Sequence, residues 1–538
     1  MPTIPDQPFD PAQLAAFEAA RRARREAQTA ESDEPAEPGR SKGRLSRLPR
    51  VASWGPVRAT RRGTPAYTGA LELGPPTTSS FPLIDGAPRI TTAAQKRDIR
   101  TLLRGSLYSG LVPHPPAEQY PISEVMGFAL DLAEAMLRAG ANGRDTEVAV
   151  VAITATWELA PLELEITTAA VRLQYSPAGE APITEMRIVR NIGSDLSALS
   201  RIYRLVDEIV AGDIDMAGAS RRLDIIESLG PRWSPPYFLL ANGVLGITLS
   251  FLAGGDWRSA IGAFVLVLAA MGAGLVISRW AVPSFFSVAA QSAIGLALGT
   301  TTLALGWLSP GQTASAVAPL LVLLLPHPAI VAFAQDAITG FRDPANARGL
   351  SIALVVLGVL LGMPAGLVIT SSWFHVEVDP TRIELVPLTL PWALLASTVA
   401  ALANAVGQGA AGRTMPMIAV AAAVTSCAQR AFLAFGFTAL FATFAAATVL
   451  GVICTLAAAR MRTAVLVLAV PAYCGALLPA LAVAYSLLNL VAGTPQAGYD
   501  FATAMLSTLG IGAGLVLGTQ LATPSVRRLV ARHHETAS

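Results

Sequence analysis

The charged residues of this chain of 538 residues are distributed very unevenly, and this distribution limits what the chain can fold into. Only 16 charged side chains lie between Tyr237 and Thr523, whereas about 56 precede Tyr237. Soluble proteins have about 25% charged residues, and this chain has 14%. We therefore expect a first part that folds in water and a second part that lies in lipid.

The second part contains ten apolar segments, each close to the ~20 residues that cross a bilayer as a helix. They cover approximately residues 237–253, 259–278, 284–307, 315–337, 350–373, 387–406, 414–434, 436–458, 464–490 and 501–522. Their boundaries are least distinct at 278–284 and 429–436, where apolar sequence nearly continues. The pattern predicts a mainly α integral membrane protein with ten transmembrane helices.

The arginines between these segments predict the orientation of the chain. With ten spans and a cytosolic N-terminus, nine arginines fall on the cytosolic side: Arg279, Arg342, Arg348, Arg413, Arg460, Arg462, Arg527, Arg528 and Arg532. Three fall outside: Arg258, Arg382 and Arg430. Because cytosolic loops are enriched in arginine and lysine, both termini are predicted to be cytoplasmic. The first ten residues also lack the pattern of a secretory signal.

The part before the first span is predicted to contain a tail and a small domain. Residues 1–92 are rich in Pro, Arg, Glu and Ser, which is typical of disorder. Residues 93–230 are predicted to form a cytosolic α/β domain, ahead of a transmembrane domain at 237–523 and a cytosolic tail at 524–538.

Within the predicted α/β domain, apolar residues recur at helical spacing until Gly140, and Asp145 is expected to cap a second helix that ends near Trp157. Alternating patterns predict strands near 162–166 and 171–175 and a third strand with Met186 and Ile188 on one face. Two further helices are expected, near 195–211 and 215–229.

Several classes of function are disfavoured by what the sequence contains. The net charge of +2 leaves no basic surface typical of nucleic-acid binding. The three cysteines lie in apolar stretches without metal-ligand spacing, so we predict no disulfide framework, no metal and no cofactor. No glycine-rich phosphate loop and no hydrolase or metalloprotease motif is found. The sequence therefore predicts a protein that is not an enzyme.

A short phrase occurs in both the fourth and the ninth apolar segments. Leu324-Leu325-Pro326 precedes Gly340, and Leu477-Leu478-Pro479 precedes Gly493, with fourteen residues from proline to glycine in each case. Segments that are five apart cross the membrane in opposite directions, so the phrase predicts two inverted five-helix repeats, as in many secondary transporters. Chance recurrence of a short apolar phrase is the alternative.

The prolines of this phrase predict where a small solute binds. A proline inside a span leaves a backbone carbonyl without its helical partner, and in lipid that carbonyl must be satisfied by protein, water or substrate. Pro326 and Pro479 are the candidate substrate-binding positions, together with His327, Asn404 and Tyr485. For each amide or tyrosine side chain, packing is the alternative.

Ionisable groups inside spans are candidates for ion coupling. Asp336 and His327 are therefore the candidate proton-coupling residues. For Asp336 the alternative is solvation at the interface beside Arg342, and for His327 it is a neutral contact between helices.

A glycine ladder marks the tenth apolar segment. Gly510, Gly514 and Gly518 are spaced so that they lie along one face of a helix, where they permit close approach of a second backbone. We expect a packing seam within one molecule. A dimer face is the alternative, so a homo-oligomer remains open.

Four segments together resemble the threonine/serine exporter family, also called ThrE. They are Phe128 to Asn142, Asp195 to Ile214, Leu252 to Trp257, and Leu324-Leu-Pro326 through Asp336 and Gly340 to Arg348. The resemblance covers about three quarters of the chain, from Ser123 to Thr523. The family usually has Pro-Gly where this chain has Pro326-His327 and Pro479-Ala480, which raises the question of a different substrate.

The resemblance implies a secondary exporter of threonine, serine or related small amino acids, driven by the proton gradient across the bacterial plasma membrane. Its partners would be the amino-acid substrate, protons and the lipid bilayer, and no nucleic acid. Two alternatives stay open: a membrane-anchored hydrolase that acts through the cytosolic domain, and a regulatory protein with a transporter-derived body.

Overall fold

The computed structural model describes residues 120–537, except 160–161, 168–169, 178–180, 190–194, 230–232, 281, 375–382 and 384. The predicted tail at residues 1–92 lies outside the described residues, and so does the start of the predicted α/β domain. Side chains are described up to Val526.

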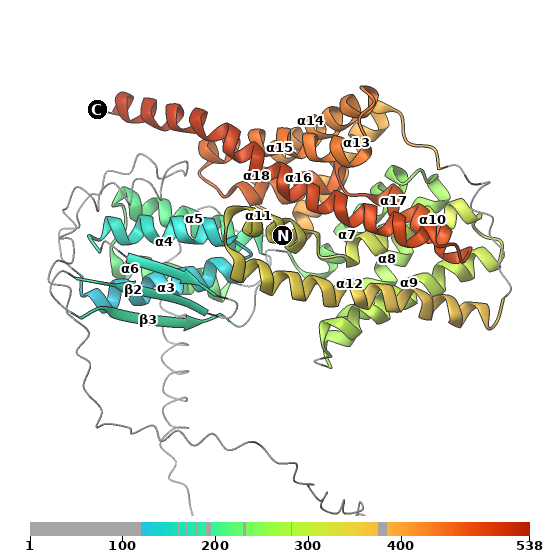
Figure 1. Cartoon of the computed structure of the whole chain (residues 1–538), viewed down its shortest axis with the longest axis horizontal. Coiled ribbons are helices and arrows are strands. Elements are labelled where there is room, and N and C mark those ends of the chain that lie inside the picture. Colours follow the sequence, from blue (N-terminus) through green and yellow to red (C-terminus); the bar gives the residue numbers. More distant parts are fainter. Residues whose placement is uncertain are drawn as a thin grey trace, which may run out of the picture. The chain divides into compact units, whose positions relative to one another are not determined.

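The first described elements form a small α/β unit, here called the α/β segment (Tyr120–Leu229; Figure 1). Its elements are α3 (Ile122–Arg138), α4 (Gly143–Thr156), β1 (Leu162–Ile166), β2 (Ala170–Tyr175), β3 (Ile183–Ile188), α5 (Leu196–Ala211) and α6 (Met216–Ser228). The three strands form an antiparallel sheet in the order β1-β2-β3. All four predicted helices and all three predicted strands are therefore present.

The sheet buries one face against α3. Val171 and Leu173 of β2 are fully buried, as their alternation with polar residues predicts. Met186 and Ile188 of β3 share one face, as expected, but that face is exposed. The register explains this, because it pairs Arg187 with Val171 and so turns Arg187 toward α3, where it forms ion pairs with Asp131 and Glu134.

The predicted cap of α4 is wrong by three residues. The helix begins at Gly143, and the cap is Asn142, whose side-chain oxygen accepts a hydrogen bond from the Asp145 amide at 2.7 Å. Either residue type can cap a helix, and the sequence pattern did not distinguish them. Asp145 therefore lies in the first turn of α4, and its carboxylate is available for other contacts. Asp195 and Asp215 do cap α5 and α6, as their position before each apolar run suggests.

Each of the ten predicted apolar segments coincides with one helix or with one broken pair of helices. They are α7 (Pro235–Leu252), α8 (Trp257–Ser278), α9 (Ser284–Ala304), α10 (Pro310–Leu324) with α11 (His327–Thr339), α12 (Arg342–Ser371), α13 (Leu390–Gly407), α14 (Met415–Ala434), α15 (Ala439–Met461), α16 (Val465–Ala476) with α17 (Ala480–Val491), and α18 (Gln496–Ala537).

By length and hydropathy, seven of these helices in the described chain can cross a membrane, and nine spans result if each broken pair counts as one. The remaining helix, α7, is apolar but shorter. Many large apolar side chains on these helices are exposed, among them Leu361, Val368 and Leu395, which is the expected state of a surface that faces lipid. The chain is a mainly helical, multi-pass membrane protein.

In the described chain, ladders of glycines bring two helix pairs close together. Gly514 and Gly518 of α18 lie against the backbone of α15, where an added Cβ would come within 3.0 Å of backbone atoms. Gly358, Gly362 and Gly366 of α12 meet the backbone of α9 in the same way. The predicted ladder on α18 is thus a seam within one molecule, and α12 carries a second ladder that was not predicted.

The α15–α18 seam makes a direct prediction. Leucine at Gly518 would force the backbones apart, so we expect Gly518→Leu to lower the free energy of unfolding by about 1–3 kcal/mol. Gly510→Leu is the matched control, since a Cβ there has ordinary contacts of 3.7 Å or more. Thermal unfolding of the two purified variants in detergent measures the difference. Equal melting temperatures would contradict the prediction.

Candidate functional site

Two broken helices lie within the membrane-spanning part. The axes of α10 and α11 differ by 50°, and those of α16 and α17 differ by 49°. The breaks fall at Pro326 and Pro479, the two prolines of the repeated phrase. Proline cannot donate the backbone hydrogen bond that continues a helix, which favours a break at these positions, although Pro319 and Pro471 lie inside α10 and α16 without one.

The backbone has nearly the same conformation at both breaks. Pro326 has φ −79° and ψ 63°, and Pro479 has φ −82° and ψ 52°. In each case the next amide donates to the carbonyl two residues before it, from His327 to Leu325 at 2.8 Å and from Ala480 to Leu478 at 2.9 Å. These are inverse γ-turns.

His327 is buried at the first break. Its Nε2 lies 2.6 Å from the Val322 carbonyl oxygen, which can only accept a hydrogen bond, so we assign the proton to Nε2. Nδ1 is then an acceptor, and it has no hydrogen-bond partner among the described residues. His327 can therefore make the predicted neutral contact through Nε2 and still bind a ligand through Nδ1.

Asn404 and Tyr485 lie on different helices and far from one another in the chain. Asn404 of α13 is buried close to Cys474 of α16, and its amide nitrogen has no hydrogen-bond partner among the described residues. The Tyr485 hydroxyl of α17 accepts a hydrogen bond from the Leu385 amide at 3.3 Å, in the segment before α13. Their roles in substrate binding remain predictions.

Asp336 forms a buried ion pair with Arg348. The carboxylate Oδ2 lies 3.1 Å from Nε of Arg348, and the side chains are 0% and 6% exposed. The predicted alternative for Asp336, solvation at an interface, is therefore wrong, because Asp336 is fully enclosed. Breaking such a pair by removing one partner leaves an uncompensated buried charge.

The same ion pair holds the turn between α3 and α4. Oδ1 of Asp336 accepts a hydrogen bond from the Gly143 amide at 3.0 Å, and Arg348 donates to the Ala141 carbonyl at 2.9 Å. The ring of Phe341 lies where a Cβ on residue 143 would be, so only glycine fits at this position. The α/β segment is thus joined to α11 and α12 by charge-assisted hydrogen bonds.

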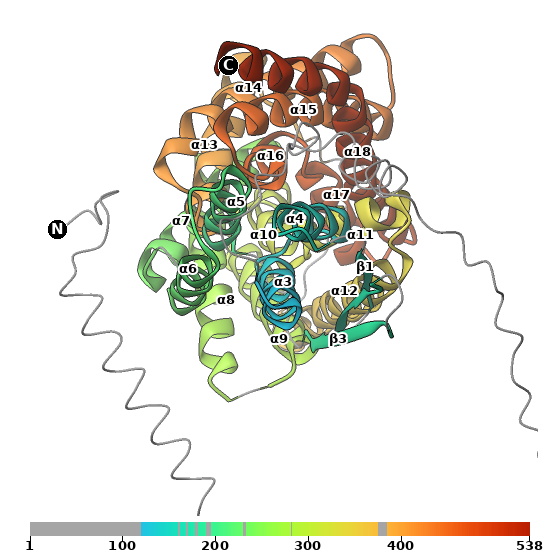
Figure 2. The same cartoon turned by 90° about the vertical axis from the view of Figure 1, so that its left-hand side faces the viewer.

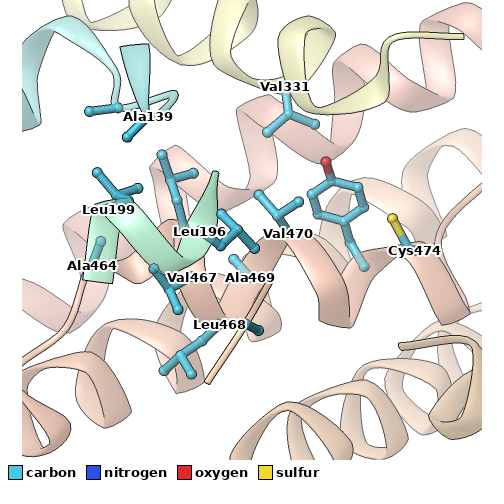
Figure 3. Packing of buried hydrophobic residues seen from close by; sticks show 14 of the residues in the cluster. Ala139, Leu196, Leu199, Val331, Ala464, Val467, Leu468, Ala469, Val470 and Cys474 are labelled. Atoms are coloured by element: carbon cyan, nitrogen blue, oxygen red, sulfur yellow. The ribbon is translucent and has the colours of Figure 1, made fainter. Parts of the chain in front are cut away.

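A second set of contacts joins α5 to the helices near α16. The Leu196 amide donates to the Gln408 carbonyl at 3.2 Å, and the Thr463 hydroxyl lies 3.4 Å from that of Ser200. Apolar packing accompanies these bonds: Leu196 and Leu199 of α5 lie against Ala464 and Val467 (Figure 3). Figure 2 shows α4 and α5 in front of α11 and α16.

A cavity of about 130 Å³ lies where these elements meet. It is lined by Asn142, Arg144, Asp145, Val148, Tyr203, Gln335, Thr339, Thr455, Ala458, Thr463, Val465, Leu466, Val516, Thr519, Gln520, Thr523 and Val526. Polar residues predominate, although most of the lining belongs to the membrane helices α11, α15, α16 and α18. None of the candidate residues from the sequence lines it.

Asp145 is the acidic group of this cavity. Burial raises its pKa from 3.8 to about 6, and the nearby Asp336 carboxylate acts in the same direction. A hydrogen bond from Tyr203 and the charge of Arg144 oppose the shift. A carboxyl group in a cavity with a pKa near neutrality is a common mark of a functional site.

Sequence reasoning missed Arg144, Asp145 and Gln335 as site residues. Asp145 was interpreted only as the cap of a helix, and neither Arg144 nor Gln335 was singled out. The available signal was the adjacent pair of opposite charges directly after Asn142. Among the described residues, no group of three or more His, Cys, Asp or Glu side chains is placed to hold a metal ion.

These features define a membrane protein with two broken helices and a polar cavity at its junction with an α/β segment. Residues 127–370 match the family model described as "Putative threonine/serine exporter" (ThrE). The chain is 29% identical to a "Probable threonine/serine exporter" of Mycobacterium tuberculosis, over 74% of this chain and 77% of that protein. It is 25% identical to a "Threonine/serine exporter" of Corynebacterium glutamicum, over 77% of this chain and 86% of that protein. No solved structure gives a significant match.

The matches to this family model and to both relatives confirm the resemblance to the ThrE family found in the sequence. Three of the four segments that carry the resemblance end at one junction: Ala141 and Gly143 lie beside Asp336 and Arg348, and the Asp195 amide donates to the Ala139 carbonyl at 3.0 Å.

The buried ion pair makes a prediction about stability. Arg348→Gln removes one partner and leaves Asp336 uncompensated, so we expect a loss of about 3–5 kcal/mol in the free energy of unfolding. Asp336→Asn/Arg348→Gln should lose less than the sum of the two single variants, because neither charge is then left alone. Hydrogen exchange of the α3–α4 turn in purified protein would show faster exchange in the single variants.

The matched control is Arg342→Gln, at the exposed start of α12. It should leave exchange in the α3–α4 turn unchanged. Additive effects of the two single variants would show that the pair contributes nothing beyond its separate members.

Proposed function

We propose that this protein is a secondary active exporter of threonine and serine, driven by the proton motive force. The observation that carries the proposal is the pair of broken helices with the same backbone conformation at Pro326 and Pro479. The names of the two relatives support the substrate class.

The helix packing supports two inverted five-helix repeats, α7–α12 and α13–α18, and hence ten spans with α7 as the first. In the first half, α7 packs on α8 and α9 on α12; in the second, α13 packs on α14 and α15 on α18. The glycine ladders occur at the same place in each half, on α12 and on α18. Repeats of this kind place the substrate where two broken helices face each other.

The two halves differ in how the broken helices meet, which supports alternating access. In the described chain α10 of the first half packs against α17 of the second half. The equivalent pair, α16 of the second half and α11 of the first, has little direct contact. The cavity lies between α11 and α16. We propose that the structure is closed on the α10–α17 side and open toward the α/β segment.

The contacts of the α/β segment support a cytosolic location for it and for both termini. Its bonds reach Asp336, Gln408 and Thr463, which lie at the ends of three different spans. All three ends fall on the side where arginine is concentrated, which is the cytosolic side by the positive-inside rule. We propose a cytosolic domain at residues 93–230, a transmembrane domain at 237–523 and a cytosolic tail.

The substrate site is proposed at the two γ-turns. His327 contributes its free Nδ1 as an acceptor for a substrate hydroxyl or ammonium group. Asn404 and Tyr485 are proposed to contact the substrate during the rearrangement of α16 and α17, because Asn404 lies close to Cys474 of α16 and Tyr485 belongs to α17.

Asp336 is the proposed proton-coupling group. Its protonation would remove the charge that Arg348 and the Gly143 amide stabilise, and this would release the α3–α4 turn from α11. A gradient of ~100 mV supplies about 2.3 kcal/mol per charge, which corresponds to roughly fortyfold accumulation of a solute.

The hydrolase alternative has less support. No histidine or cysteine occurs between Tyr120 and Gly230, so the α/β segment lacks the usual nucleophile and base pairs. The observed contacts instead give this segment a role in covering the cavity.

Proline at the two breaks should be required for transport. Pro326→Ala and Pro479→Ala would each remove the proline at the centre of a γ-turn, so we expect threonine counterflow in proteoliposomes to fall close to the rate of empty vesicles. Pro319→Ala and Pro471→Ala are the matched controls, because these prolines lie inside α10 and α16 without a break. Full counterflow in both break variants would contradict the proposed site.

Coupling to protons should depend on Asp336. With an imposed gradient, the wild type should accumulate threonine up to roughly fortyfold, and Asp336→Asn should only equilibrate it while counterflow persists. Asp343→Asn, at the exposed first turn of α12, is the control and should accumulate normally. Accumulation by the wild type that a protonophore does not abolish would exclude proton coupling.

A further inference from the structure

The cavity between the α/β segment and the membrane helices has a lining that needs an explanation. It combines a cation, Arg144, with an anion, Asp145, and a set of hydroxyl and amide side chains. Although α11 and α16 contribute to its lining, it is separate from the two helix breaks, since Pro326, His327 and Pro479 do not line it. Polar groups that line a cavity beside apolar helices are costly unless they are hydrogen-bonded.

The two charges lie next to each other at the start of α4. No carboxylate among the described residues lies within ion-pair distance of the Arg144 guanidinium; Glu147 and Asp145 act on it only at longer range. A guanidinium binds a carboxylate through two parallel hydrogen bonds, and a helix N-terminus favours the same negative group. The Asp145 carboxylate, hydrogen-bonded to Tyr203, can accept an ammonium group.

A third group in the cavity also lacks a partner. The side chain of Gln335 is buried, with 9% exposed, and its amide oxygen has no hydrogen-bond donor among the described residues. A buried acceptor without a donor is unfavourable. A ligand with a hydroxyl or N–H group would supply the missing hydrogen bond.

We propose that this cavity binds the zwitterion of a small free amino acid, with Arg144 on its α-carboxylate, Asp145 on its α-ammonium group and Gln335 accepting a hydrogen bond from its side-chain hydroxyl. That this amino acid is threonine or serine rests on the proposed function. The zwitterion chemistry rests on the three side chains alone.

The assignment gives the α/β segment a part in binding. This segment supplies both charges, and the membrane helices supply Gln335 and the threonine hydroxyls. The amino acid is therefore held only when α4 is docked on α11 through Gly143 and Asp336. The cavity also lies between α11 and α16, where a solute from the cytosol would enter in the proposed state.

Binding should depend on pH through Asp145. Burial raises the pKa of this carboxyl to about 6, so it is mostly ionised at pH 7.5 and mostly protonated at pH 5. Only the ionised form attracts an ammonium group, and affinity should fall as the pH falls through 6. The charged and titratable groups around it are Arg144, Glu147, Tyr203 and Asp336.

Equilibrium binding of labelled L-threonine to the full chain in lipid nanodiscs tests the proposal. Arg144→Gln and Asp145→Asn should each weaken binding about tenfold to a hundredfold, as expected for loss of a charge-assisted hydrogen bond. Arg221→Gln and Asp213→Asn, exposed residues of the α/β segment outside the cavity, should leave the affinity unchanged.

Two analogues separate the roles of the charges. L-threonine methyl ester lacks the carboxylate, so it should compete poorly with labelled threonine for the wild-type protein. For the Arg144→Gln variant, the ester should compete as well as unlabelled threonine does. N-acetyl-L-threonine lacks the ammonium group, so it should compete poorly for the wild-type protein. For the Asp145→Asn variant, it should compete as well as unlabelled threonine does. The affinity of Asp145→Asn should also be independent of pH between 5 and 7.5.

The Gln335→Leu variant tests whether weaker binding could result from loss of stability. It removes a buried oxygen without a partner, so the protein should be as stable as the wild type or more so. It should bind threonine more weakly, while binding of L-alanine, which lacks the hydroxyl, stays the same.

Unchanged threonine affinity in all three variants, in protein that still exports threonine, would overturn this assignment and leave the proposed function standing. A wild type that neither binds nor exports threonine or serine would overturn both.

Discussion

The ion pair between Asp336 and Arg348 is the contact on which the arrangement of this protein depends. Two opposite charges buried at the junction are stable only while both are present and their remaining hydrogen-bonding capacity is used. The Gly143 amide donates to Asp336 and the Ala141 carbonyl accepts from Arg348, so the ion pair also joins the α/β segment to α11 and α12. Phe341 packs over Gly143 and leaves no room for a side chain there.

This contact connects the two candidate sites. Asp336 belongs to α11, the second half of the first broken helix, and the turn it holds carries Arg144 and Asp145 into the cavity. A change in the charge of Asp336 would therefore act on the broken helix and on the cavity together. In the proposed exporter, proton exchange and amino-acid entry would be linked through a few hydrogen bonds at one turn, without any long path through the molecule.

Much of the membrane part could be predicted from the sequence because its determinants are local. Apolar runs marked every helix, Pro326 and Pro479 marked both breaks, and the spacing of Gly514 and Gly518 marked a close seam. The ladder of Gly358, Gly362 and Gly366 on α12 has the same spacing and could have been found by the same reasoning. The start of α4 was misplaced because Asn142 and Asp145 are both good caps and only the folded turn selects between them.

The sequence by itself determined which segments are helices, where two of them break, and which family the chain resembles, because periodicity, proline and segment order act over short distances. Only the tertiary structure decided what Asp336 does. It lies 193 residues from Gly143 and 12 from Arg348, and the hydrogen bond and ion pair that join the three depend on how α4, α11 and α12 pack. The cavity is likewise a product of packing, since its lining comes from six helices whose polar residues share no pattern along the chain.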